Sequence, residues 1–475
     1  MGTPTGPTRL LPVVALVGRP NVGKSTLYNV LTRTRDAIVS DLSGLTRDRH
    51  YGICESSEGH RYMVVDTAGL TVSPDALTQH MAGQARIAVE EADVILLVVD
   101  GRAGLLRDDI DIAAELRRSG KPVLLVVNKT DGLDEELTLT EFATLGLPSV
   151  GTSAAHHRGV NDLQDEFLEL LGLPDEPPPE EEFDPRDDRC RVAIVGRPNV
   201  GKSTLINRLL GEERLLTFDQ AGTTRDAIEV EVEWDERPYL LIDTAGMRRR
   251  SRIDEAVEKF SVIKAFQAID QAQVVVFVID AREGFAEQDA TILGQVLDSG
   301  RALVIAINKW DGLSNSERTE VRRRLDLGLD FLEFAKRIPI SALHGSGLGE
   351  LMKAVRQAWH CALKEFSTND LTEAITAAFV AHQPPLVNGR ASKMRYVHQG
   401  GRNPPRIVIH GSRLKNLPES YKRYLQNSMR KRFRLIGTPV KLEFREGKNP
   451  FADRKNTLTD RQMQKKRRLL KHVKR

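Results

Sequence analysis

One string, Gly-Arg-Pro-Asn-Val-Gly-Lys-Ser-Thr, occurs twice without change in this 475-residue chain, at 18–26 and at 196–204. Four shorter motifs follow each copy in the same order and at nearly the same separation. They are Thr-Arg-Asp at 46–48 and 224–226, Asp-Thr-Ala-Gly at 66–69 and 243–246, Asn-Lys-x-Asp at 128–131 and 308–311, and Ser-Ala at 153–154 and 341–342. A repeat of this length matches a whole domain. The chain is therefore predicted to hold two copies of one domain.

Each copy alternates short apolar runs with longer stretches of helical character. The runs lie at 13–17, 62–65, 94–99 and 123–127 in the first copy, and at 192–195, 240–242, 274–279 and 303–307 in the second. Unbroken apolar strands are typical of a parallel sheet that is buried on both faces. We therefore expect two α/β domains, each with a mainly parallel sheet and helices on both faces.

The pattern changes after the second copy. A helix at 371–382, strands at 393–398 and 406–410, a helix at 419–433 and a strand at 440–444 predict a small α+β domain. We expect a flexible N-terminus at 1–10, a first domain at 11–173, an acidic, proline-rich linker at 174–188 and a second domain at 189–365. The small domain then covers 366–446, and a basic tail covers 447–475.

Charge is distributed unevenly along the chain. Residues 366–475 contain 26 lysines and arginines against 7 aspartates and glutamates, although the whole chain has a formal net charge of only +3. A basic end of this density indicates a polyanionic partner, either nucleic acid or an anionic membrane surface. A merely solvated surface is the alternative.

Cysteine usage and hydropathy indicate the compartment. The three cysteines lie far apart and form neither a zinc motif nor a disulfide framework. The apolar runs are shorter than the roughly 20 residues of a transmembrane helix, and the N-terminus does not have the pattern of a signal peptide. We expect a cytoplasmic monomer without a membrane span.

The duplicated string follows an apolar run and opens a helical stretch, which is the setting of a phosphate-binding loop, or P-loop. Its glycines let backbone amides surround a β-phosphate. Lys24 and Lys202 are expected to reach the phosphate oxygens and to act in catalysis, whereas the hydroxyls of Ser25 and Ser203 are expected to bind Mg²⁺.

The two copies of Asp-Thr-Ala-Gly predict a γ-phosphate sensor. Asp66 and Asp243 end apolar runs and are expected to hold Mg²⁺, while Gly69 and Gly246 donate backbone amides to the γ-phosphate.

Threonines between these motifs complete the expected metal site. Thr46 and Thr224 would meet Mg²⁺ and the γ-phosphate and take part in catalysis, although Thr223 competes for this role in the second copy.

Asn-Lys-x-Asp predicts the choice of base. Asp131 and Asp311 can accept hydrogen bonds from the N1–H and 2-amino groups of guanine, which adenine does not offer as a pair. A buried carboxylate left unpaired is costly, so GTP and GDP are the expected ligands rather than adenine nucleotides.

Together these motifs give the full set of residues expected to bind the nucleotide in each site. Those of the first copy are Gly18, Asn21, Gly23, Lys24, Ser25, Thr26, Asp66, Gly69, Asn128, Lys129, Asp131, Ser153 and Ala154. Those of the second copy are Gly196, Asn199, Gly201, Lys202, Ser203, Thr204, Asp243, Gly246, Asn308, Lys309, Asp311, Ser341 and Ala342.

Hydrolysis must proceed without the glutamine that positions water in Ras-like proteins, because Leu70 and Met247 take its place. Asn21 and Asn199 stand where a related subgroup of GTPases holds K⁺, and a cation there would offset the developing charge. Alternatively, each asparagine only bonds the loop.

The ordered motifs resemble the Der family, also called EngA, of bacterial double-Era-like GTPases. The most specific matches are the twin loops and residues 243–250, 420–425 and 437–439, and the resemblance covers residues 12–446. It implies a role in assembly of the large ribosomal subunit and a KH-like C-terminal domain that binds rRNA. No Gly-x-x-Gly occurs between 366 and 475, so ordinary KH-type clamping of RNA is not expected.

Two functions remain open. The first is a GTP-hydrolysing switch that acts in ribosome biogenesis on the large subunit precursor. The second is a GTPase that scaffolds proteins or an anionic membrane surface.

Overall fold

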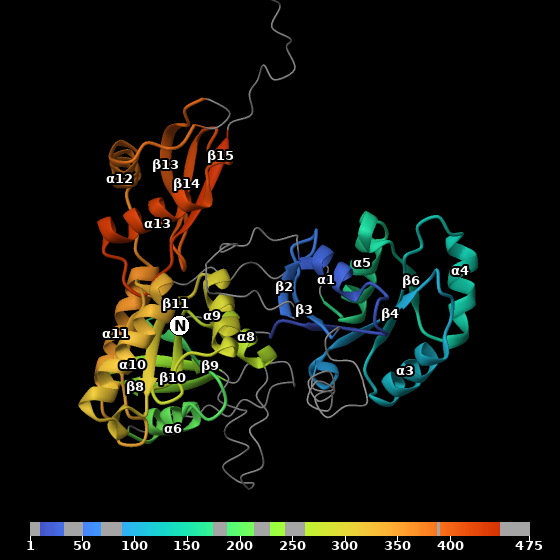
Figure 1. Cartoon of the computed structure of the whole chain (residues 1–475), viewed down its shortest axis with the longest axis horizontal. Coiled ribbons are helices and arrows are strands. Elements are labelled where there is room, and N and C mark those ends of the chain that lie inside the picture. The colour runs from blue at the N-terminus through green and yellow to red at the C-terminus, as the bar shows by residue number, and fades with distance from the viewer. Residues whose placement is uncertain are drawn as a thin grey trace, which may run out of the picture. The chain divides into compact units, whose positions relative to one another are not determined.

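The structure is a computed structural model that describes residues 10–32, 51–67, 88–173, 188–212, 229–242, 262–386 and 390–446. Residues 10–173 form an α/β domain around a six-stranded sheet (Figure 1). Its strands are β1 (Val13–Val17), β2 (Tyr51–Glu55), β3 (Arg61–Asp66), β4 (Val94–Asp100), β5 (Val123–Asn128) and β6 (Ser149–Gly151). The order is β2-β3-β1-β4-β5-β6, and only β2 runs antiparallel to its neighbour.

Helices cover both faces of this sheet. They are α1 (Lys24–Thr32), α3 (Arg107–Arg118), α4 (Glu135–Phe142) and α5 (Val160–Leu170), with 3-10 turns at Ala143–Leu145 and Ala154–His156. Leu27 of α1 and Phe167 of α5 pack with Leu16 on one face, whereas Phe142 of α4 packs with Ala15 on the other. Neighbouring residues of β1 thus point to opposite faces.

The second domain repeats this topology. Its strands are β7 (Cys190–Val195), β8 (Glu229–Trp234), β9 (Arg237–Ile242), β10 (Val274–Asp280), β11 (Ala302–Asn308) and β12 (Lys336–Pro339), in the order β12-β11-β10-β7-β9-β8. Its helices are α6 (Lys202–Glu212), α8 (Val262–Gln271), α9 (Glu287–Ser299), α10 (Asn315–Gly328) and α11 (Leu348–Ala362). The prediction of two mainly parallel sheets is confirmed.

A three-stranded sheet forms the C-terminal part. It contains β13 (Lys393–Gly401), β14 (Arg406–Ser412) and β15 (Lys441–Glu446), with β14 antiparallel to β13 and parallel to β15. Helices α12 (Thr368–Ala381) and α13 (Glu419–Phe433) pack on it. The predicted small α+β domain is confirmed.

The chain divides into two compact units, and their boundary does not follow the sequence order. The unit with both six-stranded sheets also includes residues 434–439, which lie far along the chain. In this segment Gly437 accepts a hydrogen bond from the amide of Leu303 at 2.6 Å and donates its own amide to Phe334 at 2.7 Å. The fully buried Thr438 donates its hydroxyl to the carbonyl of Ala358 at 2.9 Å. These contacts give residues 437–439 a structural role.

Among the described residues, no helix is both long enough and apolar enough to cross a membrane.

Candidate nucleotide-binding sites

Parallel strands bring three motifs of the first copy to one edge of its sheet. The P-loop follows β1, Asp66 ends β3, and Asn128 ends β5. The carboxyl ends of these strands meet at that edge, as in other open α/β sheets that bind nucleotides there.

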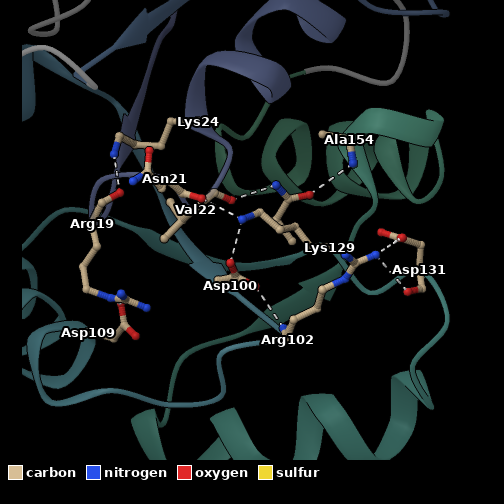
Figure 2. Close-up of polar contacts among 11 residues, drawn as sticks. Arg19, Asn21, Val22, Lys24, Asp100, Arg102, Asp109, Lys129, Asp131 and Ala154 are labelled. Atoms are coloured by element: carbon tan, nitrogen blue, oxygen red, sulfur yellow. Dashed lines mark hydrogen bonds and ion pairs between the residues drawn. The ribbon is translucent and has the colours of Figure 1, made fainter.

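Asn128 joins three motifs of the first copy (Figure 2). Its Nδ2 donates to the carbonyl of Val22 in the P-loop at 2.9 Å, and its Oδ1 accepts the amide of Ala154 at 3.1 Å. Asn128 is only 2% exposed. A Cβ on Gly23 would lie 2.3 Å from this Nδ2, and Gly23 has φ +101°, so the glycine is required both for its backbone conformation and for this approach.

The second copy repeats this geometry. Asn308 donates to the carbonyl of Val200 at 2.8 Å and accepts the amide of Ala342 at 2.9 Å. A Cβ on Gly201 would lie 2.2 Å from Nδ2 of Asn308. The amides of Ala154 and Ala342, two of the predicted site residues, thus donate to asparagine side chains in this structure.

The lysine of each Asn-Lys-x-Asp motif also returns to the P-loop. Lys129 Nζ donates to the carbonyl of Asn21 at 2.7 Å and to Oδ2 of Asp100 at 2.6 Å (Figure 2). In the second copy, Lys309 Nζ lies 2.9 Å from the carbonyl of Asn199 and 2.5 Å from Oδ2 of Asp280. Sequence reasoning missed Asp100 and Asp280, although each ends a central apolar strand.

Lys24 lies inside the P-loop rather than in solvent. It is 3% exposed, and its Nζ donates to the carbonyls of Gly18 and Arg19, both at 2.7 Å. Burial lowers the pKa of Lys24 to about 8, against the opposing effect of Asp66. Lys202 donates to the carbonyl of Arg197 at 2.6 Å. An amine held among carbonyls at this loop is placed to exchange them for phosphate oxygens.

The P-loop arginines are anchored by buried aspartates. Arg19 Nε bonds Oδ1 of Asp109 at 2.7 Å, and Arg197 Nε lies 2.9 Å from Oδ2 of Asp289. Both aspartates are fully buried in the first turns of α3 and α9. These arginines therefore hold the loop on a helix. The sequence carried a signal for the pairs, because both members recur in both copies.

Asp131, the expected base-reading residue, has three partners. Ser153 donates its hydroxyl to Oδ1 at 2.9 Å. Arg102 forms an ion pair with Oδ2 (Figure 2), and Nε2 of His156 lies 3.8 Å from the same oxygen. The Ser153 hydrogen bond lowers the pKa of Asp131, with a further contribution from Arg102. Ser341 similarly lowers the pKa of Asp311. Both carboxylates are therefore held ionised and can accept hydrogen bonds. Sequence reasoning did not single out Arg102.

The donors available for Mg²⁺ are a carboxylate and a hydroxyl. Asp66 is 1% exposed at the end of β3, while Ser25 and Thr26 are exposed in the first turn of α1. The pairing of β1 with β3 places Asp66 beside Leu16, two residues before Gly18 of the P-loop. Oxygen donors of this kind suit Mg²⁺. Ser203 and Thr204 occupy the matching turn of α6.

Several predicted site residues lie outside the described part of the chain. They are Thr46, Gly69, Leu70, Thr224, Asp243, Gly246 and Met247. Asn21 and Asn199, the candidate K⁺ residues, have φ of 65° and 61°. Asparagine tolerates this left-handed conformation better than most residues, so the loop shape gives a second reason for its presence.

Family models match most of the chain. A model described as 50S ribosome-binding GTPase matches residues 13–129 and 191–309. A second, described as the C-terminal KH-domain-like domain of EngA bacterial GTPase enzymes, matches residues 365–445. Together they match the larger part of each α/β domain, up to the Asn-Lys pair of the base-reading motif, and the small C-terminal domain.

Whole-chain relatives share the same organisation. GTPase Der of Stenotrophomonas maltophilia (strain K279a) is 55% identical over 466 residues, which cover 98% of this chain and 100% of the relative. GTPase Der of Pectobacterium carotovorum subsp. carotovorum (strain PC1) is 52% identical over 98% of this chain and 99% of its own length. Among solved structures, the FeoB G-domain from Methanococcus jannaschii is 27% identical, covering 34% of this chain and 99% of its own, with a TM-score of 0.27. The chain therefore belongs to the Der (EngA) family of double-Era-like GTPases.

Proposed function

We propose that this GTPase is a ribosome assembly factor that binds the large ribosomal subunit precursor through its basic C-terminal domain, under the control of GTP. The observation that carries the GTP part is the pair of identical asparagine bridges at Asn128 and Asn308. Two copies of one preorganised site support the binding of two guanine nucleotides per chain.

Each site would select guanine through its ionised carboxylate, Asp131 or Asp311. The hydrogen bonds from Ser153 and Ser341 keep these groups charged, and a charged acceptor bonds the guanine edge more strongly than a neutral one. Lys24 and Lys202 would bind the phosphates once they exchange the loop carbonyls that they now contact.

Mg²⁺ would be held by hydroxyl and carboxylate oxygens. The proposed donors are Ser25, Thr46 and Asp66 in the first site, and Ser203, Thr224 and Asp243 in the second. When bound, the ion would neutralise charge on the β- and γ-phosphates. We further propose that K⁺ at Asn21 and Asn199 supplies the charge compensation for which the sequence shows no arginine finger.

The described C-terminal residues support an RNA partner. The last turn of α13 presents Arg430, Lys431 and Arg432 in succession. Cations at a helix C-terminus interact favourably with the helix dipole, and the same side chains can also bind the phosphates of an RNA backbone. The family model that matches residues 365–445 is KH-like, and several KH domains bind RNA. A cytoplasmic location would fit three free cysteines.

Nucleotide control would act through residues 248–252, a run of four arginines and one serine after the second Asp-x-x-Gly motif, which lies outside the described residues. Its charge could be presented or withdrawn as the γ-phosphate is bound or lost. A coupling of about 1–3 kcal/mol, or roughly 5- to 150-fold in affinity, is typical of two-state switches.

Co-sedimentation with large-subunit precursor particles tests the proposal. Binding should fall steeply with salt and should differ between GDP and a non-hydrolysable GTP analogue. Alanine at Arg248, Arg249 and Arg250 should reduce the nucleotide dependence more than it reduces binding with GDP. Truncation after Gly447 should instead weaken binding with both nucleotides and flatten the salt dependence.

Two outcomes would contradict the proposal. Equal affinity for particles with either nucleotide would remove the switch, even if GTP hydrolysis remained intact. Binding to anionic liposomes, with none to the particles, would favour the scaffold alternative.

A further inference from the structure

The three-stranded sheet has a face opposite its buried one, and this face carries aromatic rings. Val397, Ile407 and Ile409 are fully buried on the helix side. The pairing of β13 with β14 places Tyr396 opposite His410 and His398 opposite Val408. Because side chains alternate along a strand, these four residues share the other face.

Three rings on this face lie nearly parallel. The centroids of Tyr396 and His410 are 4.2 Å apart with an interplanar angle of 11°. His398 lies 5.1 Å from His410 and 6.0 Å from Tyr396, at angles of 25° and 24°. Tyr396 is 48% exposed, so one ring of the stack remains accessible. The stack thus presents the ring of Tyr396 to solvent, supported by the half-buried rings of His398 and His410.

The stack has a cost in hydrogen bonding. Nδ1 of His398 and Nε2 of His410 are shielded from solvent and have no hydrogen-bond partner among the described residues. A shielded polar atom without a partner destabilises the fold, because it has lost its hydrogen bonds to water. Burial lowers the pKa of His410, and the nearby His398 and Arg445 lower it further, so this ring is mainly neutral at pH 7. In this arrangement the rings keep their parallel stacking, although ring nitrogens of His398 and His410 lose hydrogen bonds.

Cations lie beside the rings on the same face. The register of β14 with β15 pairs Arg406 with Lys441, Val408 with Glu443 and His410 with Arg445. Arg406 and Arg445 both contact the carboxylate of Glu443, at 3.4 and 3.2 Å. One carboxylate among three cations leaves this part of the face positive. Flat rings next to positive charge are the features that bind single-stranded nucleic acid.

We propose that the Tyr396–His410–His398 stack is a platform for unpaired RNA bases, with Tyr396 as the ring on which a base stacks. Arg406, Lys441 and Arg445 would contact the adjoining phosphates. This site lies on the open sheet face and needs no Gly-x-x-Gly loop, which the C-terminal region lacks. The inference rests on the proposed function in taking RNA as the partner, and it adds single-stranded segments as the substrate class.

Binding of fluorescent RNA to the full-length protein tests this site. The probes are oligouridylate and oligoadenylate of about 12 nucleotides, within the range of roughly 4–16 nucleotides known for stacking grooves. An abasic ribose-phosphate of equal length is the third probe. Tyr396→Ala should weaken binding of the two base-containing probes by roughly 5- to 150-fold, corresponding to about 1–3 kcal/mol per stacked base. Its salt dependence should stay parental, because no charge is lost.

Matched variants separate stacking from other effects. Tyr396→Phe keeps the ring and should bind as the parent does. Arg445→Ala should weaken all three probes and flatten the salt dependence. His382→Ala is the control for loss of an aromatic ring elsewhere in the C-terminal domain, because His382 lies beside the ring of Tyr424, at 4.7 Å, at the end of α12.

The outcomes distinguish this inference from the proposed function. Parental affinity of Tyr396→Ala for the base-containing probes would overturn the stacking site, as would equal binding of abasic and base-containing probes by the parent. Either result would leave particle binding intact. If the parent protein bound base-containing oligonucleotides better than the abasic probe but did not bind the particles, the ribosomal proposal would be overturned and the platform supported.

Discussion

The side-chain amide of Asn128 donates to the carbonyl of Val22 at 2.9 Å and thereby fastens the base-reading motif to the P-loop. The same side chain accepts the amide of Ala154, so one buried residue positions three motifs. Asn308 makes the equivalent pair of bonds in the second domain. These motifs lie far apart in the sequence, and in each copy one buried asparagine side chain links them through hydrogen bonds.

Asn128→Ala should lower GTP affinity at the first site. The change leaves the Val22 carbonyl and the Ala154 amide without their partner, and a lost buried bond costs about 1–3 kcal/mol, or roughly 5- to 150-fold if all of it appears in binding. Titration calorimetry should show one weakened and one parental site. Asn161→Ala, on the exposed side of α5, is the control. Equal weakening of both sites would contradict this local account.

Asp131→Asn and Asp311→Asn should each weaken GTP at their own site only. The amide offers a donor where guanine also presents donors, so the pair is mismatched. Xanthosine triphosphate has a carbonyl in place of the guanine amino group, and it should bind the altered site better than GTP does. Calorimetry of the parent must first give two nucleotides per chain. A single titratable site under saturating GTP and Mg²⁺ would remove the two-site claim.

Arg102 makes the surroundings of the base-reading carboxylate different in the two sites. It forms an ion pair with Asp131 in the first site. Arg282 stands at the equivalent position in the second site, and no ion pair between it and Asp311 is found among the described residues. Arg102→Ala alone should leave GTP binding close to parental, because Arg102 is exposed and surface pairs contribute little.

The strands and motif order were predictable because unbroken apolar runs and glycine-rich loops are local signals. The runs at 94–99 and 123–127 correspond closely to β4 and β5. Edge strands such as β2 and β6 were missed, since each is short and only partly buried.

The cross-motif contacts were less predictable. Asn128 bonds Val22, and Arg19 bonds Asp109, because segments far apart in the sequence pack together. The spacing of motifs along the sequence does not predict such packing. The aromatic stack was missed for the same reason, because Tyr396, His398 and His410 become neighbours only through the register of β13 with β14.

Asp109→Ala should destabilise the first domain. Asp109 is fully buried and bonds Arg19 Nε at 2.7 Å, so its removal leaves a partly buried guanidinium without its carboxylate. Removing one partner of a buried pair typically costs about 3–5 kcal/mol, and the partial exposure of Arg19 favours the lower end. Urea unfolding followed in the first domain should show the loss. Asp108→Ala, at the preceding and exposed position of α3, should leave the midpoint unchanged. A parental midpoint for Asp109→Ala would mean that the pair does not anchor the loop.

Hydrolysis should be faster in K⁺ than in Na⁺ at matched ionic strength. Leu70 and Met247 cannot order water, and a cation at Asn21 and Asn199 would stabilise the charge that develops between the phosphates. Steady-state phosphate release in the two salts measures the effect, with GTP affinity determined in parallel. Equal rates would eliminate K⁺ as the substitute for the missing glutamine.

Arg445→Ala should raise the pKa of His410. In the parent, burial lowers that pKa below its ordinary 6.5, and the neighbouring His398 and Arg445 lower it further. Glu443 lies between Arg445 and Arg406, so removing Arg445 also frees a carboxylate that favours protonation. NMR titration of the imidazole C–H signals should show the increase, with Arg413→Ala as the control.

The same shift fixes the sign of a stability effect. Between the folded pKa of His410 and 6.5, the unfolded chain binds more protons than the native one, so acidification through this window weakens the C-terminal fold. Arg445→Ala should narrow the window and reduce that acid loss. If the pKa of His410 stayed unchanged in Arg445→Ala, the arginine would not act on the ring, and its place beside the stack would have to serve phosphate contact alone.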